Sequence, residues 1–92
     1  MQTLTRPVAP KLDRLPPYSV VLHNDDRNDM AFVVQTISHL ARLPVADAFE
    51  RMLEAHHDGQ AIVLKSHREH AEFVCDAFHS KGLVASVEPS RD

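Results

Sequence analysis

Two short polar runs hold the side chains of this sequence that are best suited to binding or chemistry. The run HNDD at positions 23–26 places an imidazole, an amide and two carboxylates directly after a short apolar segment. The run HHD at positions 56–58 adds two imidazoles and a carboxylate. Both runs also have a structural interpretation, because Asn and Asp dominate turns and a histidine can stabilise the last carbonyls of a helix. The residues alone leave both interpretations open.

Patterns that would support catalysis, a metal ion or a nucleotide are missing from the sequence. G-x-S-x-G, paired-cysteine and H-E-x-x-H motifs do not occur, and His67 with His70 lacks a third ligand at an obvious spacing. Cys75 is the only cysteine, and Gly59 and Gly82 are too few for a phosphate-binding loop. We therefore expect a protein that is not an enzyme and that has no cofactor and no metal site.

The composition is that of one small globular domain. The chain has 92 residues, of which 43% are hydrophobic and 25% are charged, which suits a single core. A net charge of -3 with scattered Lys and Arg argues against a nucleic acid partner. No apolar run approaches the roughly 18 residues of a membrane span, and no secretion signal is visible. We expect a protein of the reducing cytoplasm.

The elements around the two polar runs are expected to begin with a strand and two helices. The β-branched run YSVVLH at 18–23 predicts a strand. Apolar residues at three- and four-residue spacing then predict a helix over 30–43, capped by Asn28 or Asp26. Pro44 suits the first turn of a second helix, which continues into the second polar run. One polar run therefore precedes the first helix, and the other ends the second.

The rest of the chain predicts a strand, a helix and a strand. The apolar run AIVLK at 61–65 predicts a strand. The pattern S-x-x-E at 66–69 is typical of a capping box that opens a helix. LVASVE at 83–88 alternates like a half-buried strand. Gly59 and Gly82 are expected to end the helices before these two strands.

This element order, β-α-α-β-α-β, predicts an α+β sandwich. We expect a three-stranded antiparallel sheet that is covered on one face by three helices. The domain is expected over residues 18–90. Residues 1–17 contain four prolines, which lack backbone donors, and are expected to form a mobile N-terminal tail.

The segments YSVVLHNDDRNDMAFVV and FERMLEAHHDGQAIV resemble the two signature segments of the ClpS family, and GLVASVEP is similar to its last strand. ClpS proteins are adaptors of the Clp protease that bind N-degrons, the destabilising first residues of substrate proteins. The resemblance implies that Asn24 and His56 contact the α-amino group of the substrate, with Asp26 supporting them. An α-ammonium presents three donors, for which an amide oxygen, a neutral imidazole and a carboxylate are suitable acceptors.

The same resemblance implies a pocket for the side chain of that first residue, which in the family is Phe, Tyr, Trp or Leu. Two positions depart from the family pattern, because Asn28 replaces a more usual threonine and Ala55 a more usual valine. Judged without the resemblance, the methionines fit a core as well as a binding surface. The pocket residues expected are Leu22, Asn28, Met30, Met52, Ala55 and Leu83.

The resemblance also implies a macromolecular partner, a Clp-family Hsp100 unfoldase of the ClpA or ClpC type. Glu69 and the N-terminal tail are expected to engage it, although Val74 stands where a docking lysine is usual. The adaptor is expected to act as a monomer, without nucleic acid and away from membranes. The alternative is a structural protein-interaction domain without N-degron binding, like the C-terminal domain of ribosomal stalk proteins.

Overall fold

Strands and helices follow one another as the sequence predicts. The computed structural model describes residues 16–90, so the expected tail lies outside the described residues except for Pro16 and Pro17. The order β-α-α-β-α-β and the α+β class are both confirmed. The elements are β1 (Tyr18–His23), α2 (Met30–Ala41), α3 (Val45–Asp58), β2 (Gln60–Ser66), α4 (Arg68–Ser80) and β3 (Ala85–Pro89).

The sheet is antiparallel, and β1 lies at its centre in the order β2-β1-β3. Val20 pairs with Leu64 and Val21 with Ile62, so that Val63 is an extra residue in β2 and forms a bulge. The bulge lets two consecutive residues of β2 contact the core, since Val63 is buried and Leu64 packs against the same cluster. Because β1 pairs on both sides, its last residues are held firmly where the first polar run begins.

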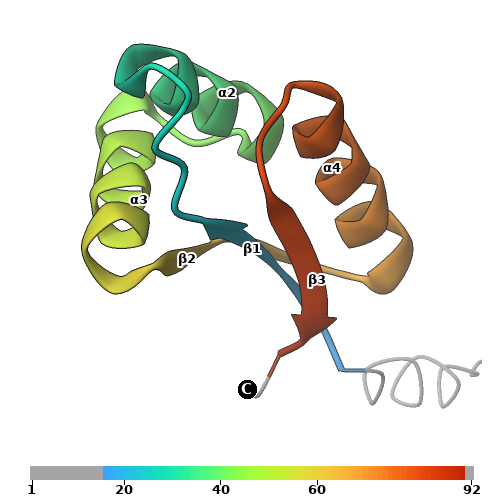
Figure 1. The fold of residues 1–92 in the computed structure, drawn as a ribbon. Helices are drawn as coiled ribbons and strands as arrows, with labels where there is room; N and C mark the ends of the chain where they lie inside the picture. The colour runs from blue at the N-terminus through green and yellow to red at the C-terminus, as the bar shows by residue number, and fades with distance from the viewer. Residues whose placement is uncertain (1–15, 91–92) are drawn as a thin grey trace, which may run out of the picture.

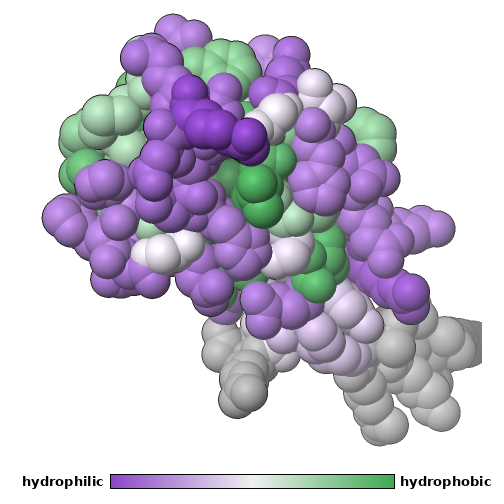
Figure 2. Space-filling model, viewed as in Figure 1, coloured by the Kyte–Doolittle hydropathy of each residue, from purple (hydrophilic) through white to green (hydrophobic). Residues whose placement is uncertain are grey.

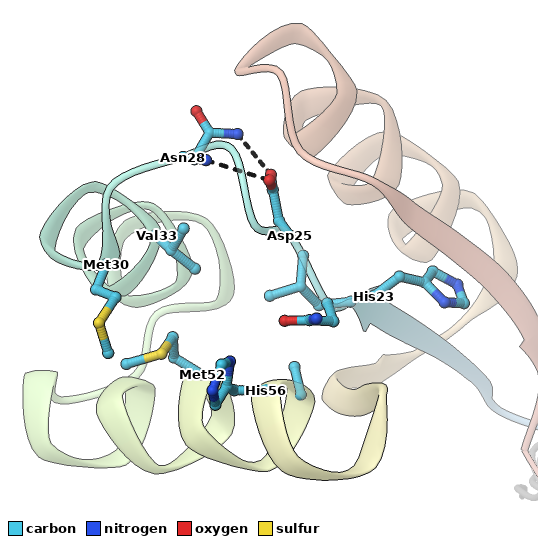
Figure 3. A pocket seen from close by; sticks show the side chains of 10 residues that line it. His23, Asp25, Asn28, Met30, Val33, Met52 and His56 are labelled. Atoms are coloured by element: carbon cyan, nitrogen blue, oxygen red, sulfur yellow. Dashed lines mark hydrogen bonds between the residues drawn. The ribbon is translucent and has the colours of Figure 1, made fainter.

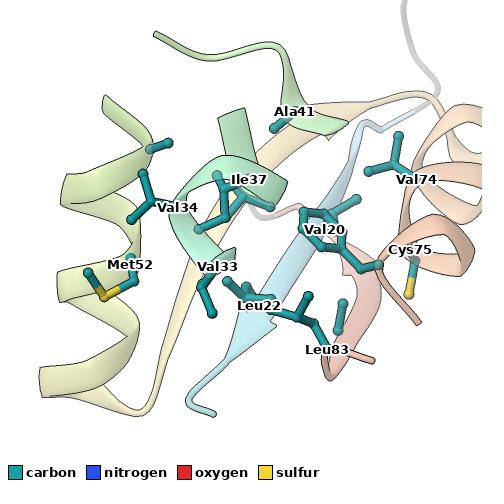
Figure 4. Packing of buried hydrophobic residues seen from close by; sticks show 14 of the residues in the cluster. Val20, Leu22, Val33, Val34, Ile37, Ala41, Met52, Val74, Cys75 and Leu83 are labelled. Atoms are coloured by element: carbon teal, nitrogen blue, oxygen red, sulfur yellow. The ribbon is translucent and has the colours of Figure 1, made fainter. Parts of the chain in front are cut away.

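The three helices of the described region gather on one face of this sheet, as Figure 1 shows. Figure 4 shows the core between them, where Val20 and Leu22 of β1 meet Ile37 of α2 and Val74 of α4. Burying side chains of this size contributes about 1.5–3 kcal/mol each. Figure 2 shows an apolar strip in the middle of one face of the molecule, bordered by polar side chains. None of the described helices is long and apolar enough to cross a bilayer.

Both predicted helix caps are wrong. The N-cap of α2 is Asp29 rather than Asn28 or Asp26, because residues 25–28 form a turn of their own before the helix. The N-cap of α4 is His67, whose Nδ1 accepts the N–H of His70. Ser66 cannot open that helix because it is the last residue of β2 and pairs with Tyr18.

The helix ends agree better with the predictions, with shifts of a few residues. Gly59 ends α3 with φ 92°, and its N–H donates to the carbonyl of Ala55. In α2 the helix stops at Ala41 because Arg42 adopts a left-handed conformation with φ 57°, two residues before the predicted end. The predicted last strand begins at Ala85 instead of position 83, since the N–H of Leu83 still donates to the end of α4.

Candidate functional site

A small hollow lies between α2, α3 and the end of β1, and it opens beside both polar runs. Its volume is about 40 Å³. Figure 3 shows Met30 of α2 and Met52 of α3 approaching each other across it, with Val33 behind them and His56 beside Met52. The lining residues are Leu22, His23, Asn24, Asp25, Asn28, Met30, Val33, Met52, Ala55 and His56.

The loop between β1 and α2 takes its shape from Asp25. Its Oδ1 accepts the backbone N–H groups of Arg27, at 2.8 Å, and of Asn28, at 3.2 Å, while its Oδ2 accepts the side-chain amide of Asn28 (Figure 3). Burial on its own would raise the pKa of Asp25, but these hydrogen bonds and the nearby charge of Arg27 outweigh it and lower that pKa. The carboxylate therefore stays ionised and acts as a fixed acceptor within the loop.

Asn24 is held at both its backbone and its side chain. Its N–H donates to the carbonyl of Gly59, 2.9 Å away, which ties the loop to the turn after α3. Its Nδ2 donates to Oδ1 of Asp26 at 3.3 Å. With the amide nitrogen directed to Asp26, the amide oxygen is the acceptor that Asn24 offers to a ligand.

His56 lies in the last turn of α3, where the geometry of Gly59 ends the helix. Its side chain is exposed and also lines the hollow. The ring of His57 meets it edge to face, with 5.6 Å between ring centroids. An exposed imidazole at the rim can exchange bonds to water for bonds to a ligand, because it is not committed to the core.

The apolar wall of the hollow combines fixed and movable side chains. Met52 and Ala55 are 6% and 4% exposed and belong to the packed face of α3. Met30, at the start of α2, is 54% exposed. Methionine is unbranched and adapts readily to a partner. The wall can therefore change shape on the side of Met30 while the side of α3 stays fixed.

Most of the residues implied by the family resemblance come together here, and a few do not. Asp26 does not line the hollow and reaches it only through Asn24. Leu83 is buried in the core cluster instead. His23, which the resemblance did not imply, also lines the hollow, but its ring points away in Figure 3, where its Nε2 lies 2.9 Å from Oγ of Ser86 on β3.

Three residues that line the hollow were not among the predicted site residues, namely His23, Asp25 and Val33. Asp25 belongs to the polar run that was singled out, but nothing in the run itself separates its role from that of Asp26. Val33 lies three residues after Met30, so the helical spacing that places one on this face also places the other.

The other candidate groups do not form a second site. Glu69 is exposed in the first turn of α4. Cys75 is buried, and burial together with the charge of Asp76 raises the pKa of its thiol. Within residues 16–90, no group of three or more His, Cys, Asp or Glu side chains is placed to hold a metal ion. The fold and the hollow thus define a small α+β domain with a half-polar, half-apolar binding hollow at its rim.

Comparison with known proteins places this domain in a family. The family model "ATP-dependent Clp protease adaptor protein ClpS" matches residues 13–86. The ClpS adapter of Synechococcus sp. strain CC9902 is 44% identical over 77 residues, covering 83% of this chain and 74% of that protein. The chloroplastic adapter of Arabidopsis thaliana is 40% identical over 75 residues, covering 80% of this chain and 47% of that protein.

A solved structure agrees with these sequence matches. It is that of Agrobacterium tumefaciens ClpS2 bound to L-phenylalaninamide, with a TM-score of 0.75 and 29% sequence identity. The similarity covers 84% of this chain and 100% of the other. The chain belongs to the ClpS family of ATP-dependent Clp protease adaptors.

Proposed function

We propose that this adaptor binds the first residue of substrate proteins when that residue is Phe, Tyr, Trp or Leu, and delivers them to a Clp Hsp100 unfoldase. The observation that carries the proposal is the hollow itself, where the acceptors of Asn24 and His56 border an apolar wall. Support comes from the ligand of the ClpS2 structure, because L-phenylalaninamide combines a free α-amino group with an aromatic side chain. The adaptor performs no chemical step.

The amino group is recognised by acceptors from two elements. The amide oxygen of Asn24, held toward the hollow by the bond from its nitrogen to Asp26, takes one donor of the ammonium. A neutral imidazole nitrogen of His56 takes a second. The carboxylate of Asp26 adds negative charge nearby. An internal residue of a protein has no such ammonium, so the site selects chain ends.

The side chain of the first residue enters between the two methionines. A cavity of about 150 Å³ holds a benzene molecule, whereas this hollow measures about 40 Å³. Binding therefore requires the wall to open, and the exposed side chain of Met30 is the part free to move. Met52 and Ala55 form the fixed floor against which the ligand packs.

Delivery uses a surface that is separate from the hollow. The C-terminal end of α4 leads to the turn beside the hollow, and Glu69 lies at the other end. The helix has 13 residues, so its ends are about 20 Å apart at about 1.5 Å per residue. A substrate and an unfoldase of the ClpA or ClpC type can therefore be held together by one monomer, which raises the effective concentration of the substrate.

The test is calorimetric titration of the chain with L-phenylalaninamide and with its N-acetylated form. We expect binding of the first and a loss of at least tenfold in affinity for the second, since acetylation removes the charged donor. Equal affinity for the two compounds would contradict ammonium recognition. Absence of binding to either would favour the alternative, a structural protein-interaction domain.

A further inference from the structure

The side chain of Asn28 connects two turns that are far apart in the sequence. Its Nδ2 donates to Oδ2 of Asp25 within the β1–α2 loop (Figure 3). The same nitrogen donates to the carbonyl oxygen of Gly82, 3.2 Å away and 54 positions later in the chain. A side-chain amide nitrogen carries two N–H donors. Both donors of Asn28 are thus committed within the protein, and neither is left for a ligand.

The turn that contains Gly82 supports the wall of the hollow from behind. Leu83 is 3% exposed and belongs to the same core cluster as Leu22, which lines the hollow. The carbonyl of Val84 accepts the N–H of His23 at 2.9 Å, at the point where β1 ends. The position of this turn therefore sets the position of the last residues of β1, from which Asn24 projects.

We propose that Asn28 is a positioning residue that fixes the width of the hollow by holding the β1–α2 loop against the α4–β3 turn. This role rests on the proposed function, and it requires no contact between Asn28 and the ligand. Asp25 takes part in the same positioning, because it orients the amide of Asn28 toward Gly82 and also fixes the loop backbone.

The chemistry of Asn28 sets it apart from the threonine that the family resemblance leads one to expect. A threonine hydroxyl has one donor, so it can replace the bond to Asp25 or the bond to Gly82 but not both. The turn also has little freedom to follow a shorter side chain, because the N–H of Gly82 donates to the carbonyl of His79 and the N–H of Leu83 to the carbonyl of Phe78. The connection between the two turns is therefore a property of asparagine at this position.

Four variants test the role in the full-length chain. Asn28→Ala removes both bonds, and Asn28→Thr retains one. The exchange Asp25→Asn with Asn28→Asp restores a bond between the two side chains, but a carboxylate at 28 cannot donate to Gly82. Gln35→Ala removes an exposed amide from α2 outside the hollow and serves as the matched control.

Affinities for L-phenylalaninamide and L-leucinamide are measured at a temperature at which circular dichroism shows every variant folded. We expect the Ala, Thr and exchange variants to lose about two- to tenfold in affinity, the range for one lost hydrogen bond. The loss should be larger for the leucine compound, which fills a widened hollow less well. If Asn28 only stabilised the fold, its replacement would lower both affinities by the same factor, because it would reduce only the fraction of folded protein. Wild-type affinity and selectivity in the exchange variant would overturn the proposal.

Hydrogen exchange provides a readout that needs no ligand. The N–H groups of His23 and Leu83 should exchange faster in the Asn28 variants than in the wild type or in Gln35→Ala, because the turn that orders them is released. Unchanged exchange would also overturn the proposal. If the wild type failed to bind L-phenylalaninamide, the proposed function would fall, while faster exchange would still support the connection between the turns.

Discussion

The proposed function assigns the acceptors for the ammonium to two side chains from different elements, Asn24 in the β1–α2 loop and His56 in α3. We predict that Asn24→Ala or His56→Ala lowers the affinity for L-phenylalaninamide at least tenfold, because a hydrogen bond to a charged group contributes about 1.5–3 kcal/mol. His57→Ala is the control, since His57 is also an exposed imidazole but does not line the hollow. Calorimetric titration should show it within about twofold of the wild type. An equal loss in all three variants would indicate a general effect of helix α3.

Asp25 gives the loop a dependence on pH whose direction follows from its lowered pKa. A carboxyl group with a lower pKa in the folded state stabilises that state above its usual pKa of about 3.9. This contribution is lost as the pH falls through the lowered value. We predict that Asp25→Asn reduces the free energy of unfolding at pH 7 and that the difference from the wild type shrinks below pH 4. Urea denaturation at several pH values measures it, and a difference independent of pH would contradict the argument.

The element order could be predicted from the sequence because hydrophobic period and length separate strands from helices here. The strand at 18–23 has the predicted bounds, since β-branched residues end abruptly at a turn cluster. The caps could not be predicted, because Asp25 competes with Asp26 for the same backbone donors and Ser66 is taken by strand pairing. Local patterns cannot decide which of two nearby side chains wins such a competition.

The sequence predicts some parts of the candidate site but not others. The polar side chains of Asn24 and His56 could be proposed from type and from family resemblance, and both line the hollow. The link from Asn28 to Gly82 could not be proposed, because it joins positions 54 apart and depends on the path of the α4–β3 turn. Contacts between distant turns become visible only when the sheet is assembled.

The cap of α4 offers a prediction at the scale of one element. The bond from the N–H of His70 to Nδ1 of His67 measures 3.4 Å, which is long for an N-cap. Aspartate is among the best N-cap residues, and its charge interacts favourably with the helix N-terminus. We predict that His67→Asp stabilises the protein by about 0.5–1 kcal/mol at pH 7. Thermal and urea denaturation measure it, and an unchanged or lower stability would show that the imidazole is already an effective cap.

In the proposed function, the floor of the hollow in α3 determines which first residue fits. Ala55 is 4% exposed and lines the hollow one turn after Met52. Ala55→Val adds two carbons there, and each buried methylene contributes about 0.8 kcal/mol. We predict that the variant binds L-leucinamide several-fold more tightly and gains less for L-tryptophanamide, which already fills the space and can become overpacked.

The exposed Ala46 in the first turn of α3 provides the control for this prediction. Ala46→Val introduces the same β-branched side chain into the same helix, outside the hollow. Its affinities for both amides should equal those of the wild type. Equal changes for leucine and tryptophan in Ala55→Val would show that Ala55 does not set selectivity.

At the scale of the whole molecule, the fold separates the hollow from the end of α4 at which we expect the unfoldase to dock. The hollow lies where α2 and α3 meet the end of β1, whereas Glu69 lies at the far end of α4 (Figure 1). The turn that follows the C-terminal end of α4 is connected to the rim of the hollow by the hydrogen bond from Asn28 to Gly82. Changes at Glu69 are therefore expected to leave the hollow intact, and changes at Asn24 to leave α4 intact.

This separation predicts that the two activities can be removed independently. Glu69→Ala should bind L-phenylalaninamide within about twofold of the wild type, yet slow the degradation of a Phe-led reporter by a reconstituted Clp protease several-fold at limiting adaptor. Asn24→Ala should bind the unfoldase normally but fail to deliver the reporter. Glu50→Ala, which removes an exposed glutamate from α3, is the matched control and should deliver like the wild type. Binding measurements beside each delivery assay separate the two defects: Glu69→Ala should lose affinity for the unfoldase and keep it for L-phenylalaninamide, whereas Asn24→Ala should do the reverse. If Glu69→Ala lost ligand affinity together with delivery, the two surfaces would be coupled, and the separation inferred from the fold would be wrong.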